Sequence, residues 1–440
     1  IELSVYRMTK RLFFALFLLS VAGGSVAAQE ASVLTLQQCR EAAVSRSPLT
    51  ERQGLAAEKR QARDRVTGAG WIPQIDINAQ ASYQNETVRF PGDLPIPISL
   101  DLPKDQYKAT VDLNQVIYDG GSMRKTRQIN AATEEVETAS LAVQLDRLRD
   151  RVNDTYVRIL LTDRQLKVNG LMQQTLASDI KSVEAQMANG TATGAAQAAL
   201  TARLLELRQQ EAELRGTKTA LGEALSVLTG LTVTDGTALQ VPEVPVGLPE
   251  AAATGEDVAG WRTELQLYER QQEQLEIQDK LLNSKAIPKI SLFASGGYGR
   301  PGYNFLDRDF ALMAIGGVRL NVPLTGWETA RREKQANRIA SRDIDEQRRD
   351  FERNVSIEVA QYRTEIERLR QVTALDAQIV AARTAVRERS LAQFKGGVIT
   401  HSDYLTEFNN EVAARINAET NALRLVQAWL GYEAARGIYK

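Results

Sequence analysis

Two stretches of nearly seventy residues almost completely lack the residues that interrupt a helix. Residues 122–189 contain no proline and a single glycine, Gly170, and residues 328–395 contain neither proline nor glycine. At 1.5 Å per residue, each stretch can form a helix about 100 Å long. Segments such as DEQRRDFERN are too polar for lipid, so these helices belong in water. Spacings of three and four residues predict packing seams at Leu141, Leu145, Leu148, Val152, Thr155 and Ile159.

Four shorter segments alternate between apolar and polar residues instead. In QIDINAQASYQ, residues 74–84, every second residue is apolar, a pattern typical of a strand with one apolar and one polar face. The same alternation predicts strands at about 71–84, 107–118, 287–298 and 310–323. Proline-rich residues 85–106 fit neither a strand nor a helix and indicate a long exposed loop. Strands of about ten residues are long enough to cross a bilayer when they are tilted.

The whole order of segments occurs twice along the chain. Ile287-Pro288 repeats Ile72-Pro73 at an offset of 215 residues, and Leu320-Asn321 repeats Leu113-Asn114 at an offset of 207. Gly190 and Gly397 are also separated by 207 residues. These shared offsets indicate a tandem structural duplication. The predicted organisation is a first repeat at 29–228 with long helices at 122–228, a linker at 229–260, and a second repeat at 261–440 with long helices at 328–436.

The N-terminal segment has the features of a secretory signal peptide. The basic stretch Met8–Arg11 precedes an apolar stretch, Leu12–Val21, and small residues up to Ala28 predict cleavage after that position. The alternative is a membrane-spanning helix, but the apolar run is too short. Residues 1–28 are therefore expected to comprise the signal peptide and a few residues upstream of Met8. No later apolar run is long enough to cross a bilayer as a helix.

Composition argues against several classes of function. A net charge of -1 gives no global field that would attract nucleic acid. With one cysteine, Cys39, and one histidine, His401, the chain lacks the ligands of a Cys/His metal site and has no internal disulfide. The motifs GxxxxGK[ST], HExxH and GxSxG are missing from the sequence. We therefore expect no cofactor, no metal, no nucleic-acid partner and no enzymatic activity.

The strands require partners outside the chain. Four strands cannot close a barrel of useful width, and open sheet edges are not tolerated in lipid. Three copies would supply twelve strands, which close with an apolar exterior and a polar interior. The residues predicted to face this lumen are Gln74, Asp76, Asn78, Gln80, Lys108, Asp112 and Arg319. The alternative is a soluble sheet with one face on a core, but the neighbouring helices run too long to cover it.

These features together resemble the TolC family of outer-membrane efflux proteins, from about residue 33 to 437. The resemblance is carried by the strand starts WIPQIDINAQASY and AIPKISLFASGGY, the corners LNQVIYDGG and LNVPLTGW, and the segments MANGTATGAAQAALTARL and FKGGVITHSDYLTEFNNEV. It implies a mainly α protein with membrane β-structure. In that family, a homotrimer forms one twelve-stranded outer-membrane barrel that continues into a long periplasmic α-helical coiled-coil barrel.

The resemblance also implies a function and a location. The chain would be the passive exit duct of a tripartite efflux pump or a type I secretion system, placed in the outer membrane with a large periplasmic extension. A periplasmic adaptor and an inner-membrane pump would dock and open it. Two other classes stay open, a periplasmic coiled-coil adaptor or structural protein without a channel, and an exported enzyme. An outer-membrane location favours the channel over both.

The family's aperture aspartates align with the segment GGVITHSDYLTEF. Asp403 falls on the first of them, whereas Thr406 stands where a second often occurs and Glu407 is adjacent. The alternative for Asp403 is an ordinary acid near a helix start, where acids are common. His401 is expected at the surface, with a pH-sensitive gate as the alternative. The matching turn of the first repeat, GTATGAAQAAL, contains no acid.

Turns and corners complete the candidate residues. The predicted tip turns, where an adaptor would pack, contain Gly190, Thr193, Gly396, Gly397 and Thr400. Turn geometry alone is the alternative role for these glycines. The predicted corners between barrel and helices contain Gly120, Gly121 and Gly326. Trp71 and Trp327 lie at the same corners, either at the membrane interface or in ordinary packing.

Overall fold

The computed structural model describes residues 33–87, 103–189, 193–247, 262–304, 307 and 309–439. The predicted signal peptide, most of the predicted loop at 85–106, Trp261 and Gly190 lie outside these residues. The chain divides into two compact units. Unit 1 comprises Ile1–Ala43, Val152–Pro245 and Arg368–Gln427, and unit 2 comprises Val44–Arg151, Val246–Glu367 and Ala428–Lys440. Each unit thus contains segments from both sequence repeats.

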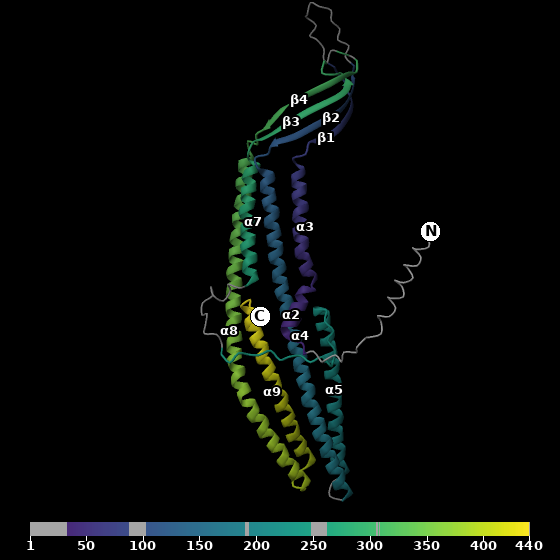
Figure 1. The fold of residues 1–440 in the computed structure, drawn as a ribbon, viewed down its shortest axis with the longest axis vertical. Helices are drawn as coiled ribbons and strands as arrows, with labels where there is room; N and C mark the ends of the chain where they lie inside the picture. Colours follow the sequence, from purple (N-terminus) through teal and green to yellow (C-terminus); the bar gives the residue numbers. More distant parts are fainter. Residues whose placement is uncertain are drawn as a thin grey trace, which may run out of the picture. The chain divides into compact units, whose positions relative to one another are not determined.

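Helices account for most of the described residues, as Figure 1 shows. They are α2 (Leu36–Ser45), α3 (Pro48–Ala69), α4 (Ser122–Ala188), α5 (Gly194–Thr229), α7 (Thr263–Lys285), α8 (Gly326–Lys395) and α9 (His401–Ala435). The two stretches without helix breakers are confirmed as single helices of 67 and 70 residues. Crossing a bilayer requires a length and an apolar character that none of the described helices combines.

The start of the helical region shows how the sequence sets helix ends. Thr35 caps α2, since its hydroxyl accepts a hydrogen bond from the Gln38 N–H at 3.2 Å. The Gln38 side chain in turn accepts from the Thr35 N–H at 3.0 Å, which makes a reciprocal capping box. A short break between Ser45 and Pro48 separates α2 from α3. Proline is tolerated in the first turn of α3, where Ser47 caps the helix.

All four predicted strands are present and form one antiparallel sheet in unit 2, in the order β1-β2-β3-β4. Their bounds are β1 (Gln74–Tyr83), β2 (Asp105–Tyr118), β3 (Lys289–Arg300) and β4 (Ala311–Asn321). The first strand starts three residues later than predicted. The reason is that the Trp71 and Ile72 N–H groups donate to the Gly68 and Ala69 carbonyls, which extends the turn that ends α3.

The core of unit 1 lies along its helices. Its centre is a cluster of buried side chains from α4, α5 and α9, namely Val168, Met172, Leu176, Val183, Ala196, Leu200, Leu207, Tyr404, Phe408 and Val412. The Tyr404 ring stacks on the Phe394 ring of α8, with centroids 5.8 Å apart. Of the predicted seam residues in α4, Leu141, Leu145, Val152 and Ile159 are buried, and Leu148 and Thr155 are half-buried.

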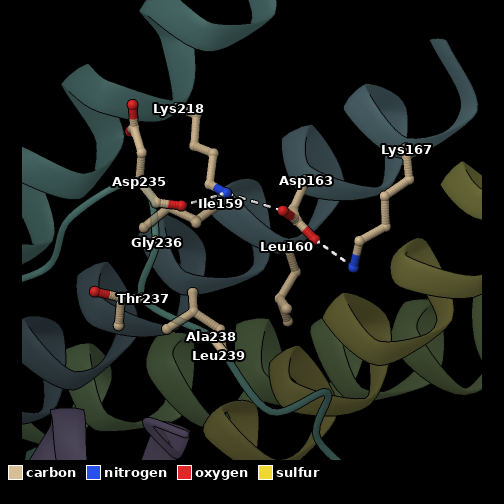
Figure 2. A pocket seen from close by; sticks show the side chains of 10 residues that line it. All are labelled: Ile159, Leu160, Asp163, Lys167, Lys218, Asp235, Gly236, Thr237, Ala238 and Leu239. Atoms are coloured by element: carbon tan, nitrogen blue, oxygen red, sulfur yellow. Dashed lines mark hydrogen bonds and ion pairs between the residues drawn. The ribbon is translucent and has the colours of Figure 1, made fainter. Parts of the chain in front are cut away.

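The described part of the predicted linker packs onto the helices of unit 1. Lys218 of α5 donates to the Asp163 carboxylate of α4 at 2.9 Å and to the Asp235 carbonyl at 3.0 Å (Figure 2). Lys167 pairs with the other oxygen of Asp163 at 2.8 Å. The small pocket of about 210 Å³ at this place is therefore lined by charges that already have partners. The hydrogen bonds of Lys218 hold the segment after α5 against the helices.

Candidate functional site

The strand register gathers the seven predicted lumen residues on one face of the sheet. Residues directly opposite each other in an antiparallel pair share a face. Gln74, Asp76, Asn78 and Gln80 of β1 stand opposite Asn114, Asp112, Thr110 and Lys108 of β2. Arg319 of β4 stands opposite Ser291 of β3, which in turn stands opposite Val116 of β2. Val116 is two residues beyond Asn114 and shares its face, so Arg319 lies on the same face as the other six residues.

Hydrogen bonds and stacking order parts of this polar face. The Asp112 carboxylate accepts from the Asn78 amide at 2.6 Å and from the Thr110 hydroxyl at 3.1 Å. The guanidinium carbon of Arg319 lies 5.0 Å from the centre of the Phe293 ring. The polar face therefore carries both acidic and basic groups, with no single sign of charge.

The opposite face of the sheet is apolar and uncovered. Ile77 is 80 % exposed, Leu312 is 86 % exposed and Val318 is 67 % exposed. At the end of this face that lies farthest from the helices, Tyr298 stacks on Phe310 with centroids 5.4 Å apart. Side chains of this kind are normally buried in a water-soluble domain, so the sheet has two faces suited to two different surroundings.

Two of the three glycines at the predicted corners take a conformation that other residues avoid. Gly120 and Gly121, between β2 and α4, have φ angles of 72° and 79°. A Cβ atom on Gly120 would lie 2.8 Å from both the Ile287 Cβ and the Ser284 carbonyl oxygen, whereas one on Gly121 would meet nothing. Gly326 is the first residue of α8. The predicted corner positions of all three thus coincide with strand-to-helix junctions.

The turn between α8 and α9 is built by a glycine. Gly397 has a φ of 72°. Its N–H donates to the Phe394 carbonyl at 3.0 Å, and the Val398 N–H donates to the Gln393 carbonyl at 2.9 Å. These two bonds form a Schellman motif, with Gly396 as the preceding C-cap residue.

Asp403 takes part in a reciprocal cap at the start of α9. Its N–H donates to the Thr400 hydroxyl oxygen at 3.2 Å. Its carboxylate accepts from the Thr400 N–H at 3.0 Å and from the Thr400 hydroxyl at 2.7 Å. These hydrogen bonds hold the pKa of the exposed Asp403 carboxyl below its usual value of 3.8. The capping role is therefore present in the single chain, while the carboxylate stays at the surface.

The three neighbours of Asp403 differ in their surroundings. His401 is the first residue of α9 and is half-buried. Thr406 is exposed, and its hydroxyl donates back to the Ser402 carbonyl at 2.9 Å. Glu407 pairs with Arg383 of α8 at 3.6 Å and accepts from the Asn410 amide at 3.3 Å. The Glu407 carboxylate is therefore already engaged within the chain.

The first repeat builds its matching turn without an acid. Thr193 is the N-cap of α5, and its hydroxyl accepts from the Ala196 N–H at 3.4 Å. Thr193 and Thr400, and likewise Ala196 and Asp403, are separated by the offset of 207 residues. The two turns therefore share the cap position, and only the second repeat adds a carboxylate to it.

A buried polar network near these turns was not predicted from the sequence. The Tyr404 hydroxyl of α9 donates to the Asp179 carboxylate of α4. Glu411 of α9 is 1 % exposed, and it accepts from Arg387 at 2.8 Å and from Arg415 at 2.7 Å. The Thr384 hydroxyl donates to the same carboxylate at 2.8 Å. The network therefore ties together α4, α8 and α9 within unit 1.

The two acids of this network have pKa values shifted in opposite directions. Burial raises the pKa of Asp179, and the Tyr404 hydrogen bond offsets only part of that effect. Burial also acts on Glu411, but hydrogen bonds from Arg415, Thr384 and Arg387 outweigh it and lower its pKa. Burial and the neighbouring Asp179 raise the pKa of Tyr404, so its hydroxyl stays protonated as a donor. A sequence signal existed, because Asp179 and Glu411 both occupy positions in phase with their helix's apolar seam.

Comparison with known proteins supports this architecture. Residues 39–231 match the family model described as outer membrane efflux protein. The fold resembles the outer membrane protein VceC from Vibrio cholerae, with a TM-score of 0.65, 16% identity and coverage of 91% of this chain and 96% of that chain. No curated protein sequence matches.

Two further solved structures are similar over comparable lengths. The open-state MtrE outer membrane channel of Neisseria gonorrhoeae has a TM-score of 0.65 at 15% identity, covering 92% of this chain and 89% of that chain. The CmeC outer membrane channel of Campylobacter jejuni has a TM-score of 0.63 at 13% identity, covering 91% and 85%.

Long helices and a four-stranded sheet with two uncovered faces are the fold that this chain shares with these outer membrane channels. The family match in the first repeat agrees with this fold. The segment at residues 39–231 thus matches the outer membrane efflux protein family, in agreement with the resemblance to the TolC family inferred from the sequence. Its members are channel proteins and not enzymes.

Proposed function

We propose that the chain is one subunit of a trimeric exit duct in the outer membrane, which serves a tripartite efflux pump or a type I secretion system. Members of the family are trimeric channels that work with adaptor proteins and inner-membrane pumps. By analogy, this chain would be exported to the outer membrane and extend into the periplasm. It would act as a passive conduit, opened when an adaptor and a pump dock.

The observation that carries the proposal is the pair of unlike faces on a sheet with open edges. The apolar face is exposed along its length, and the opposite face carries the polar and charged residues. In the described residues, β1 and β4 each have a neighbour on one side only. Lipid leaves no unpaired edge without a large cost. Three copies satisfy every edge, with the apolar face outward and Gln74, Asp76, Asn78, Gln80, Lys108, Asp112 and Arg319 toward the lumen.

The helical turns are the proposed aperture and docking region. Asp403 would present its carboxylate at the narrow end, with His401, Thr406 and Glu407 beside it. The turns that contain Gly190, Thr193, Gly396, Gly397 and Thr400 would contact the adaptor. The support for Asp403 is that its carboxylate is exposed while its cap partner fixes its position at the start of α9. Three such carboxylates near one axis would favour the passage of cations.

The test is single-channel conductance of the purified protein in a planar bilayer. We compare the wild type with Asp403→Ala and with Thr400→Ala. Both variants break the reciprocal cap, but only Asp403→Ala removes the carboxylate. Small cation-selective steps in the wild type, which grow or lose selectivity in Asp403→Ala and keep it in Thr400→Ala, are the expected result.

Three other outcomes have distinct meanings. Equal effects of both variants would assign Asp403 to the cap alone. If neither variant changes the conductance, the channel proposal stands and the constriction lies at other residues. No conductance from folded protein recovered in the outer-membrane fraction would contradict the channel and favour a coiled-coil structural role.

A further inference from the structure

A pocket of about 560 Å³ lies in unit 2 where the sheet meets the helices. It is formed by the end of α3, the turn that follows it, the end of β2 and the first turns of α4. Its lining residues are Arg60, Asp64, Trp71, Tyr118, Asp119, Gly121, Met123, Arg124, Arg127, Gln128 and Ala131. The volume is within the range of small-molecule sites, which is roughly 300–1,000 Å³.

The acids in this pocket already have partners. The two carboxylate oxygens of Asp119 accept from the Gly121 N–H at 2.8 Å and the Met123 N–H at 2.6 Å, which caps α4. The Asp64 carboxylate accepts from the Asn130 amide at 2.9 Å and lies 3.7 Å from Arg60. These carboxylates are therefore bound to groups of the chain itself.

Two of the three arginines are free to bind an anion. Arg60 pairs with Glu134 at 3.0 Å. Arg124 and Arg127 are exposed and make no hydrogen bond or ion pair with any described residue. They stand three residues apart on α4, a spacing that places both on the same side of the helix. The pocket therefore offers two uncommitted guanidinium groups, a good match for a phosphate group.

The aromatic residues of the pocket connect it to the apolar face of the sheet. Tyr118 stands opposite Ile290, which lies on the apolar face with Leu292. Trp71 lies in the turn between α3 and β1, three residues before the first residue of β1. The Gln115 amide donates to the Trp71 carbonyl at 3.0 Å, which fixes the approach to β1. Trp71 is 44 % exposed and Tyr118 is 47 % exposed, as expected of residues at a membrane interface.

We propose that this pocket binds the headgroup of an anionic phospholipid. The phosphodiester would sit between Arg124 and Arg127, Trp71 and Tyr118 would flank the glycerol region, and the acyl chains would lie along the apolar face. The orientation of the lipid rests on the proposed placement of this face in the membrane. Binding of the headgroup itself depends only on the pocket.

The test measures lipid binding to the full-length protein, purified in detergent and freed of lipid, by native mass spectrometry. The ligands are dihexanoyl phosphatidylglycerol, dihexanoyl phosphatidylcholine and inorganic phosphate. The test variant is Arg124→Gln/Arg127→Gln. The matched control is Arg331→Gln, which makes the same change at the α8 position 207 residues beyond Arg124 and does not line this pocket.

We expect phosphatidylglycerol to bind at least tenfold more tightly than phosphatidylcholine, and the double variant to lose at least tenfold in affinity for phosphatidylglycerol while Arg331→Gln keeps it. Equal binding of both lipids, or unchanged binding in the double variant, would overturn the proposal. Inorganic phosphate that binds as tightly as phosphatidylglycerol would assign the pocket to free phosphate and overturn the lipid. Conductance of the wild type distinguishes failure of this proposal from failure of the proposed channel. A wild type that conducts ions but binds no phosphatidylglycerol would contradict only the lipid site.

Discussion

Glu411 shows how much depends on a single buried side chain. Its carboxylate is nearly inaccessible and accepts hydrogen bonds from Arg387, Arg415 and Thr384. Removing one partner of a buried ionic group leaves the others uncompensated. Replacing Glu411 alone is therefore expected to destabilise the fold. This expectation does not extend to replacing all members of the network with apolar residues at once.

We expect Glu411→Leu to lower the free energy of unfolding by about 3–5 kcal/mol, because two arginines lose their buried partner. The control is Glu407→Gln on the same helix, whose partly exposed pair with Arg383 is worth at most about 1 kcal/mol. Urea denaturation followed by circular dichroism measures both. Equal losses in the two variants would show that the network contributes no more than a surface pair.

The pH dependence of stability has a defined sign at Glu411. Its pKa in the folded chain is lowered from 4.5, so the charged form is favoured by folding. The resulting stability is present above pH 4.5 and is lost as the pH falls through the folded pKa. We expect Glu411→Gln to lose less stability than the wild type between about pH 5 and pH 3, as measured by thermal unfolding. A parallel decline of the two proteins would contradict this.

At the scale of elements, the corner between β2 and α4 depends on two glycines with different tolerance. Both have a positive φ, but only Gly120 lacks room for a side chain. We expect Gly121→Ala to cost about 1 kcal/mol from backbone strain alone. We expect Gly120→Ala to cost clearly more, because the α7–β3 turn must also move. Thermal unfolding of the two variants tests the difference, and equal melting temperatures would contradict it.

The sequence predicted the elements better than it predicted the contacts between them. Alternation gave all four strands, and the lack of glycine and proline gave α4 and α8. The contact between Asp179 and Tyr404 joins positions 225 residues apart, and nothing local specifies it. The reciprocal bond between Thr400 and Asp403 was local, but the sequence favoured an aperture role for Asp403 and kept the cap only as the alternative.

For the whole molecule, the surroundings of the sheet are the property to test. Ile77 and Asn78 are neighbours on β1 and face opposite sides. In a lipid-facing barrel, Ile77→Arg would cost about 2–4 kcal/mol near the middle of the bilayer, whereas Asn78→Arg would point into water. We expect Ile77→Arg to reduce the amount of trimer in the outer membrane and Asn78→Arg to leave it unchanged. Membrane fractionation and light scattering of the detergent-purified protein measure both.

The opposite behaviour would identify a different assembly. A water-soluble sheet would tolerate a charge at Ile77, since that side chain is 80 % exposed in the single chain. Equal recovery of both variants from the soluble fraction, at the mass of a single chain, would contradict the membrane barrel.

The pairing of β2 with β3 places the hairpin of the first repeat beside the hairpin of the second repeat. In the proposed trimer, β4 of one chain would pair with β1 of the next chain in the same antiparallel way. A ring of three such sheets has six similar hairpins but only three identical chains. Any side chain found in one repeat alone therefore recurs at every second position around the ring. Asp403 is such a residue, because its counterpart is Ala196. In the proposed trimer, the duplication would therefore place three acidic and three neutral positions in alternation around the ring, a pattern that six copies of an unduplicated half could not produce.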